Sequence, residues 1–328
     1  MHNKALLLGI LNVTPDSFSD GGFFLEKEHA VHRGLELIEE GADILDIGGE
    51  STRPGAVSIS AEEELRRVIP VIRELSTKTD IPISIDTSKA IVAQAAMEAG
   101  ATIINDVSAL GDPEMGKVAA ATGAMLILMH CQGTPATMQQ NPTYPNDDVV
   151  AAVMSFLSQV RKRALDEGVK KESIILDPGI GFGKTVEHNF ALLRAIPELM
   201  QLGAPLLIGH SRKSFLKSVF PDSIAYNPTD CIETTFKVAA ADDREEHDLT
   251  GVGRADCRRQ PVGRAERERA SQPAGAQSIA AAVEVKNRFL IPSIAITSLA
   301  RYHGAMLFRV HDPRPHWEAL RTIEMLLP

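Results

Sequence analysis

The sequence has little cysteine, no long apolar run and no excess of positive charge, and each lack argues against a class of protein. The three cysteines, Cys131, Cys231 and Cys257, are too few and too irregularly spaced for a disulfide framework or a zinc site. No apolar stretch approaches the roughly 20 residues that a membrane span needs. The formal net charge of −9 argues against nonspecific nucleic-acid binding, which needs a basic face.

These absences also indicate the cellular location of the protein. The first apolar run begins at Ala5, which leaves no room for a signal peptide. We therefore expect a cytoplasmic protein that binds neither membranes nor nucleic acid. An anionic substrate is compatible with the net negative charge, because local Arg and Lys side chains can make a positive site on an acidic protein.

Short apolar runs are what the sequence has instead. Seven occur in the first two-thirds of the chain and an eighth near its end, and each leads to polar residues. Runs of this length without polar alternation are typical of strands buried on both faces of a parallel sheet. Together they predict an α/β protein, a single (β/α)₈ barrel over residues 1–328 with its active site at the C-terminal strand ends. The runs begin near residues 5, 44, 82, 102, 125, 173, 206 and 305.

Helical patterns separate the apolar runs, and several of them end at a glycine, which is a common helix stop. Ser60, with Glu63 three residues later, has the signature of a capping box. We expect Pro292 to break one helix before the next begins. The expected helices span residues 29–40, 61–75, 89–98, 113–122, 147–167, 186–202 and 293–303.

The interval between the seventh and eighth runs is unusually long. It spans roughly 100 residues, whereas a whole βαβ crossover commonly needs only about 30. Within it, residues 242–277 contain Leu249, Val252 and Val262 as their only large aliphatics and no aromatics. Such a segment buries too little apolar surface to offset its ordering entropy. We expect a disordered, low-hydrophobicity insertion between strands seven and eight.

Polar side chains that directly follow three of the runs suggest a binding site. Asp86, Asn105 and Asp177 each end a run, and a barrel brings its strand ends together around one mouth. Two carboxylates and an amide there could grip a flat heterocycle with a guanidine-like edge, because one carboxylate accepts two N–H bonds. Taken singly, an Asp at a strand end is more often a helix N-cap.

Two glycine-containing loops could complete such a site. The loop of residues 12–22 contains Thr14, Pro15 and two glycines, and it could close over a ligand or be an ordinary turn. The segment 177–184 contains three glycines, which allow a close approach of the backbone. It holds out Phe182, and an aromatic side chain placed in this way more often stacks on a ligand than fills a core.

Cationic side chains predict anion binding. Arg53 follows the second run beside two hydroxyls, and a guanidinium offers a planar fork of donors for phosphate oxygens. Lys213 lies where a helix is expected to open, a position that favours anions. Arg309 and His311 are two residues apart on the eighth run and therefore face the same side. The alternative for His311 is a structural partner of Asp312.

Eight motifs, in order along the chain, resemble the dihydropteroate synthase family: LNVTPDSFSDGG, GGESTRPGA, SIDTSK, INDVSA, LMHCQGTP, DPGIGFGK, GHSRKSF and FRVHD. The resemblance covers Leu6 to about Phe220, and then Ser293 to the C-terminus. It implies a pterin-binding (β/α)₈ barrel, usually a homodimer, that acts as a transferase in folate biosynthesis. The implied reaction joins 6-hydroxymethyl-7,8-dihydropterin diphosphate to 4-aminobenzoate, giving 7,8-dihydropteroate and diphosphate.

The resemblance also implies roles for individual residues. The pterin would be held by Asp86, Asn105, Asp177 and Lys213. The diphosphate would be surrounded by Asn12, Thr52, Arg53, Arg309 and His311. A Mg²⁺ ion would be bound by Asn12 and phosphate oxygens, in keeping with its preference for hard oxygen ligands. The 4-aminobenzoate would lie among Thr14, Pro15, Phe18, Pro54, Phe182 and Ser211. The catalytic residues would be Asp86, Lys213, Arg53, Arg309 and His311.

Two other functions stay open at this point. A methyltetrahydrofolate-binding methyltransferase barrel shares the pterin carboxylates, but it has no need of Arg53, Arg309 and His311. A catalytically inactive pterin-binding protein would keep the barrel and use the insertion to dock a partner.

Overall fold

A computed structural model of the chain describes residues 4–14, 22–51, 55–133, 137–138, 140–219 and 289–327, with the side chains of residues 22–26 left out. The predicted insertion, residues 242–277, lies outside these ranges, so its expected disorder stays a prediction.

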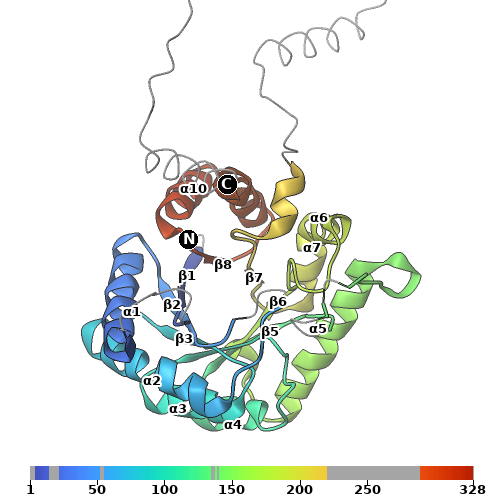
Figure 1. Ribbon diagram of the computed structural model, residues 1–328. Coiled ribbons are helices and arrows are strands. Elements are labelled where there is room, and N and C mark those ends of the chain that lie inside the picture. Colours follow the sequence, from blue (N-terminus) through green and yellow to red (C-terminus); the bar gives the residue numbers. More distant parts are fainter. Residues whose placement is uncertain are drawn as a thin grey trace, which may run out of the picture. The chain divides into compact units, whose positions relative to one another are not determined.

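Eight parallel strands form the centre of the molecule, in the order β6-β5-β4-β3-β2-β1-β8-β7 (Figure 1). The last strand, β8, pairs with both β1 and β7. An isolated bridge between Leu176 and Leu206 spans the remaining seam between β6 and β7. The predicted (β/α)₈ barrel is therefore confirmed. The strands are β1 (Leu6–Asn12), β2 (Ile44–Gly48), β3 (Ile83–Asp86), β4 (Ile103–Asp106), β5 (Met125–Met129), β6 (Ile174–Asp177), β7 (Leu207–Ile208) and β8 (Leu307–Val310).

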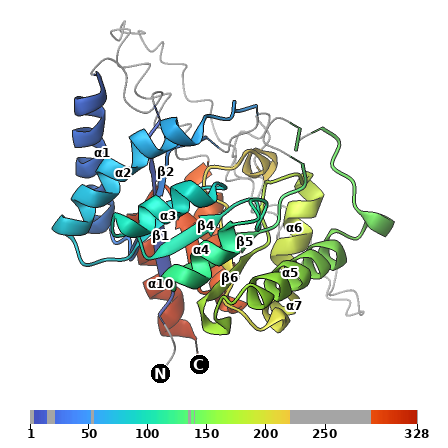
Figure 2. The ribbon, with the colours of Figure 1, turned by 90° about the horizontal axis from the view of Figure 1, so that it is seen from below.

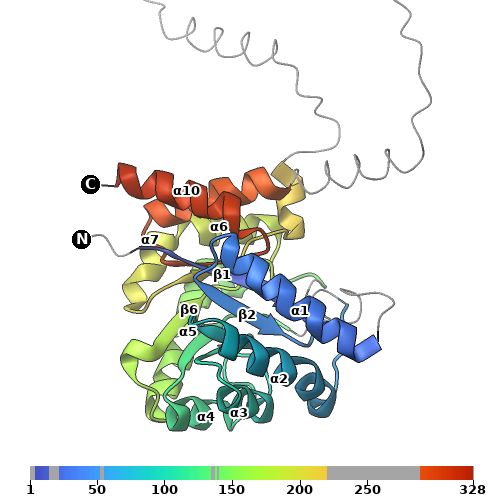
Figure 3. The same ribbon diagram turned by 90° about the vertical axis from the view of Figure 1, so that its left-hand side faces the viewer.

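The helices lie outside the strands (Figure 1). Helices α1 to α4 follow one another around the barrel, each packed on the next (Figure 2; Figure 3). No helix of the described part is long and apolar enough to cross a membrane. The helices are α1 (Gly22–Glu39), α2 (Ala61–Lys78), α3 (Ala90–Glu98), α4 (Met115–Thr122), α5 (Val149–Asp166), α6 (Val186–Arg194), α7 (Ile196–Leu199), α10 (Pro313–Leu326) and the helical residues 289–302.

Local sequence explains where these helices begin and end. The Ser60 hydroxyl accepts a hydrogen bond from the Glu63 amide at 3.2 Å, which confirms one half of the predicted capping box of α2. The Glu63 carboxylate accepts Arg66 and Arg67 rather than the Ser60 amide. The helix expected at residues 29–40 already begins at Gly22, and two other helix predictions were wrong. The segment 186–202 divides at Ala195, because Pro197 at the start of α7 cannot donate an amide hydrogen bond. Residues 289–302 are helical without a break at Pro292, so the predicted interruption there is wrong.

Alternation along the strands positions the site. Side chains of a strand point alternately to opposite faces, so residues two apart share the barrel interior. The lower interior layer is apolar and consists of Leu8, Ile44, Ile103, Ile127, Ile175, Leu207 and Leu307. Two residues further along the same strands, at the C-terminal end of the barrel, are Ile10, Asp46, Asn105, Met129, Asp177, Gly209 and Arg309. The polar side chains of the barrel interior therefore lie above a layer that is entirely apolar.

Candidate active site

A cavity of about 700 Å³ opens at the C-terminal ends of the strands. All the predicted site residues that the structure describes border it: Asn12, Thr14, Asp86, Asn105, Asp177, Phe182, Ser211, Lys213, Arg309 and His311. The remaining ones, Pro15, Phe18, Thr52, Arg53 and Pro54, lie outside the described residues. The structure thus brings together side chains from strands far apart in the chain, while their roles toward ligands stay predictions.

A buried charged group lies at the floor of this cavity. The Arg309 guanidinium donates from Nε to Asp46 Oδ2 at 2.5 Å and from Nη2 to Asp86 Oδ2 at 2.6 Å. Asn105 donates from Nδ2 to the two oxygens of Asp46 at 3.2 and 3.4 Å. Sequence reasoning assigned no role to Asp46. The sequence did contain an indication that Asp46 matters. It is a carboxylate inside the otherwise apolar strand β2, at a position where the alternation directs the side chain into the barrel.

The electrostatics of this group follow from its burial. Burial is the largest of the effects that together raise the pKa of Asp86 to about 7; Arg309 opposes the rise and Asp46 adds to it. Burial would lower the pKa of Arg309, but the carboxylates of Asp46 and Asp86 outweigh it, so the pKa is raised and the guanidinium stays charged. The Arg309 guanidinium is therefore the partner of two carboxylates, and the pKa of one of them, Asp86, is raised.

Asp177, at the end of β6, begins the glycine-rich arm. Its Oδ1 accepts the Gly179 amide at 2.7 Å, so the carboxylate caps a turn, and Asp177 borders the cavity. The arm lies tightly on the loop after β5: a Cβ added to Gly179 would stand 1.8 Å from the His130 carbonyl oxygen. Gly179 also has φ +67°, which a side chain would strain. The arm can hold its position only with glycine there.

Lys213 and Phe182 face each other at the mouth of the cavity. The Lys213 ammonium lies 4.1 Å from the centre of the Phe182 ring and donates to the Ile180 carbonyl. Burial lowers the pKa of Lys213 to about 7, against the opposing effect of Asp177. Burial raises the pKa of Asp177, and Lys213 opposes it. The expected helix after the seventh strand is, within the described residues, only a 3-10 helix, Ser214–Val219.

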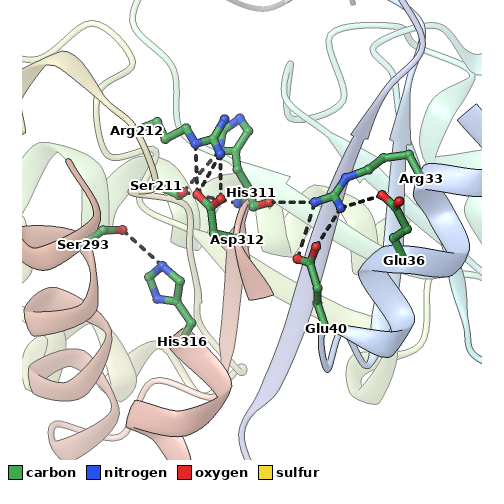
Figure 4. A network of polar contacts seen from close by, with 9 residues as sticks. All are labelled: Arg33, Glu36, Glu40, Ser211, Arg212, Ser293, His311, Asp312 and His316. Atoms are coloured by element: carbon green, nitrogen blue, oxygen red, sulfur yellow. Dashed lines mark hydrogen bonds and ion pairs between the residues drawn. The ribbon is translucent and has the colours of Figure 1, made fainter. Parts of the chain in front are cut away.

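His311 lies on the other side of the mouth, in a network of polar contacts (Figure 4). Its Nδ1 lies 3.2 Å from the Ser211 hydroxyl, and its carbonyl accepts Arg33 at 3.5 Å. Asp312 instead accepts two guanidinium nitrogens of Arg212, at 2.7 to 3.0 Å. The Asp312 carboxylate thus anchors the loop after β7, and the His311 ring is directed to the cavity-lining Ser211.

Lys184, at the end of the glycine-rich arm, is a second group to which sequence reasoning gave no role. Its buried ammonium lies 2.9 Å from His130 Nδ1 and donates to the Phe182 carbonyl at 2.9 Å. Burial lowers the pKa of Lys184 to about 7 and that of His130 to about 3, so the histidine is neutral. The contact between Lys184 and His130 therefore holds the end of the glycine-rich arm in place. In the sequence, Lys184 could have been noticed as the last residue of the GFGK motif.

A known enzyme family matches this barrel, with its carboxylates, amide and lysine around one cavity. The model of the family described as "Pterin binding enzyme" matches residues 8–246, and the chain belongs to this family. Dihydropteroate synthase of Synechocystis is 51% identical over 217 residues, which are 66% of this chain and 74% of that protein. Within the pterin-binding enzymes, the chain is thus a member of the dihydropteroate synthase family.

Solved structures agree with this placement. A dihydropteroate synthase of Xanthomonas albilineans, determined with 4-aminobenzoic acid, is 36% identical with a TM-score of 0.74, covering 99% of this chain and 95% of that one. A Yersinia pestis dihydropteroate synthase in complex with a sulfonamide drug is 34% identical with a TM-score of 0.73, covering 98% and 94%.

Proposed function

We propose that the chain condenses 6-hydroxymethyl-7,8-dihydropterin diphosphate with 4-aminobenzoate, releasing diphosphate and forming 7,8-dihydropteroate. The chain is a transferase of the dihydropteroate synthase family. The observation that carries the substrate assignment is the convergence of Asp86, Asn105, Asp177 and Lys213, from four different elements, on one cavity. The relative bound to 4-aminobenzoic acid supports the second substrate.

Recognition of the pterin follows from the buried polar groups. Asp177, with one oxygen fixed by Gly179, would accept the 2-amino and N3 hydrogens of the pterin edge. Lys213 would donate to the pterin carbonyl oxygen, and Asn105 would bond to the ring nitrogens. These contacts are charge-assisted and shielded from water, which makes them strong and selective for a guanidine-like edge.

The chemical step breaks the bond between the pterin methylene carbon and the diphosphate oxygen, which leaves with the electron pair. The 4-aminobenzoate nitrogen forms the new bond to carbon and loses its proton to solvent. Arg53, Arg309 and His311 would stabilise the negative charge that grows on the diphosphate. Asp86, at the cavity floor, would stabilise positive charge on the pterin methylene. Phe182, Pro54 and Ser211 would orient the weakly nucleophilic amine.

A Mg²⁺ ion is part of the proposal. Among the described residues, no group of three His, Cys, Asp or Glu could hold a metal ion by itself. Asn12, however, borders the cavity and offers an amide oxygen, and Mg²⁺ commonly takes one or two protein oxygens with substrate phosphates and water. The donors thus fit an ion brought with the diphosphate. When bound, it would neutralise part of the diphosphate charge.

Chelation of Mg²⁺ should weaken binding of the pterin diphosphate and leave binding of 6-hydroxymethylpterin, which has no phosphate, unchanged. The reason is that Asn12 would hold the ion, which would neutralise charge on the diphosphate, and 6-hydroxymethylpterin carries no such charge. Calorimetric titrations with and without EDTA measure both affinities, and Asn12→Ala should reproduce the effect of EDTA. Equal affinities for the pterin diphosphate in the two buffers would contradict the metal assignment.

The decisive experiment measures diphosphate release. Purified protein should release diphosphate only when both the pterin diphosphate and 4-aminobenzoate are present, with dihydropteroate formed in equal amount. Pterin binding without release would indicate a catalytically inactive pterin-binding protein. Methyl transfer from methyltetrahydrofolate, without diphosphate release, would indicate the methyltransferase alternative.

The dependence of kcat/KM for the pterin diphosphate on pH should be a bell with its maximum near pH 7. Asp86, with a pKa raised to about 7, must be ionised, so activity is lost as pH falls below it. Lys213, with a pKa lowered to about 7, must be protonated, so activity is lost as pH rises above it. Steady-state kinetics across pH measure both limbs, and a flat profile would refute the assignment.

A sulfonamide should compete with 4-aminobenzoate, because both present an aniline ring and an acidic group to Phe182 and Ser211. The relative from Yersinia pestis was solved in complex with such a drug. The apparent KM for 4-aminobenzoate should rise in proportion to drug concentration with kcat unchanged. Inhibition that excess 4-aminobenzoate does not relieve would count against this pocket.

The proposal includes a cytoplasmic homodimer. Several large apolar side chains are exposed on neighbouring helical segments, namely Leu299, Tyr302 and Trp317. We propose that these side chains form part of the contact between the two copies. Light scattering should give twice the chain mass of 35.5 kDa, and Tyr302→Glu should shift the protein toward the monomer.

A further inference from the structure

Asp46 is a buried charged residue that the proposed reaction does not use. It lies in the middle of β2, has no exposed surface and stands outside the set of residues that line the cavity. Its two side-chain partners, Arg309 and Asn105, both line the cavity. Asp46 thus supports two site residues from below.

A structural role does not require a carboxylate at this position. The layer beneath is filled by Leu and Ile alone, and Ser84, the register partner of Asp46 on β3, keeps a buried hydroxyl without a hydrogen-bond partner. Burying a charge is costly, and apolar replacements of buried ion pairs are often neutral or stabilising. The carboxylate is therefore explained by what it does to its partners.

The hydrogen bonds of Arg309 show how the Asp46 carboxylate acts on its partners. Its Nε and Nη2 donate to two different carboxylates, Asp46 on one strand and Asp86 on another. Two anchors on different atoms of a planar group fix both its position and its rotation. With Asp86 alone, the guanidinium would keep one anchor and could turn about it. The Asn105 amide would likewise lose its bond to Asp46.

We propose that Asp46 is a positioning residue that fixes the Arg309 guanidinium and the Asn105 amide beneath the pterin diphosphate. The proposal rests on the proposed function and assigns Asp46 no contact with substrate. A loss of Asp46 should then affect the pterin diphosphate and spare the 4-aminobenzoate pocket, which Phe182 and Ser211 build from other elements.

The charge of Asp46 adds a second signature. The groups that act on Asp86 are Asp46 from β2, Arg309 from β8, Glu64 from α2 and Asp106 from β4. After burial and Arg309, Asp46 has the largest effect, and it raises the pKa of Asp86. Asp46→Asn should therefore move the acid limb of the pH profile to lower pH. A residue that only filled space would not move it.

The test compares Asp46→Asn, which keeps the side-chain shape, with Ser84→Ala in the same layer. Asp46→Asn should lower kcat/KM for the pterin diphosphate about 10- to 100-fold, the scale expected from misplacing a site group. It should leave KM for 4-aminobenzoate, at saturating pterin, within about threefold. Ser84→Ala should keep both constants within about threefold of wild type. Asp46→Asn kinetics equal to those of Ser84→Ala, with an unmoved acid limb, would overturn the proposal.

Asp46→Asn could fail to fold, because removing one member of a buried ion pair is destabilising. A second variant tests the proposal in that case. Asp46→Asn/Arg309→Met removes both charges and is compared with Arg309→Met alone. Because Asp46 also fixes Asn105, a further loss smaller than the about 10- to 100-fold of Asp46→Asn alone supports action through Arg309, and a further loss of that full size overturns it. A wild type that releases no diphosphate refutes the proposed function instead. In that case, calorimetry compares the affinities of the wild type and of Asp46→Asn for 6-hydroxymethylpterin. Equal affinities reject the proposed role of Asp46.

Discussion

Asp177→Asn should lower the affinity for the pterin by at least about 30-fold. The carboxylate is 4% exposed, and its fixed orientation on Gly179 directs a charged acceptor at the pterin edge. An amide in its place would turn an N–H toward one of the pterin N–H groups. Losing a buried charge-assisted contact and leaving its partner unpaired costs about 2–5 kcal/mol, and each 1.4 kcal/mol is tenfold in affinity.

Calorimetric titration with 6-hydroxymethylpterin measures this change directly. Asp80→Asn is the matched control, because Asp80 is exposed and precedes β3 at the opposite end of the barrel. It should bind like wild type. An Asp177→Asn affinity within about threefold of wild type would show that the carboxylate does not face the pterin.

Lys213→Met should reduce kcat/KM for the pterin diphosphate about 100- to 1,000-fold, because the ammonium is the proposed donor to the pterin and acts on Asp177. Methionine keeps an apolar stem against Phe182, so the loss reports the charge rather than the packing. The residual activity should lack the alkaline limb of the pH profile, since no lysine remains to deprotonate.

Lys217→Met is the control for this variant, being an exposed lysine on the following 3-10 helix. Steady-state kinetics of the two variants, at several pH values, separate a specific effect from a general loss of positive charge. A Lys213→Met profile that kept its alkaline limb would assign that limb to another group.

The barrel was predictable because its signal is local. Each buried strand is a short apolar run, and each is followed by the residue that reaches the cavity, as with Asp86 and Asp177. The fold, and the meeting of Asp86, Asn105 and Asp177 at one mouth, could therefore be predicted from the order of the runs, whereas Asn12 and Ser211 were assigned to the site by the family resemblance. The described residues among them do lie around one cavity.

The residues without a predicted role have partners that only folding supplies. Asp46 stands inside an apolar run, and its function depends on Arg309, 263 positions away. Lys184 closes a recognised motif, but its contact with His130 crosses from one strand loop to another. The division between α6 and α7 was missed for a different reason: the apolar pattern continues across Ala195 although Pro197 prevents a continuous ladder.

The pairing of β1 with β8 has a consequence for how the protein is made. Leu6 pairs with Leu307, so the barrel closes only when nearly the whole chain is available. Strands β1 to β6 can assemble by pairing with neighbours in sequence while synthesis continues from the N-terminus. During that time Asp46 and Asp86 face each other without the cation that β8 carries. When β8 pairs with β1, Arg309 reaches Asp46 and Asp86, so the same step closes the barrel and neutralises the site.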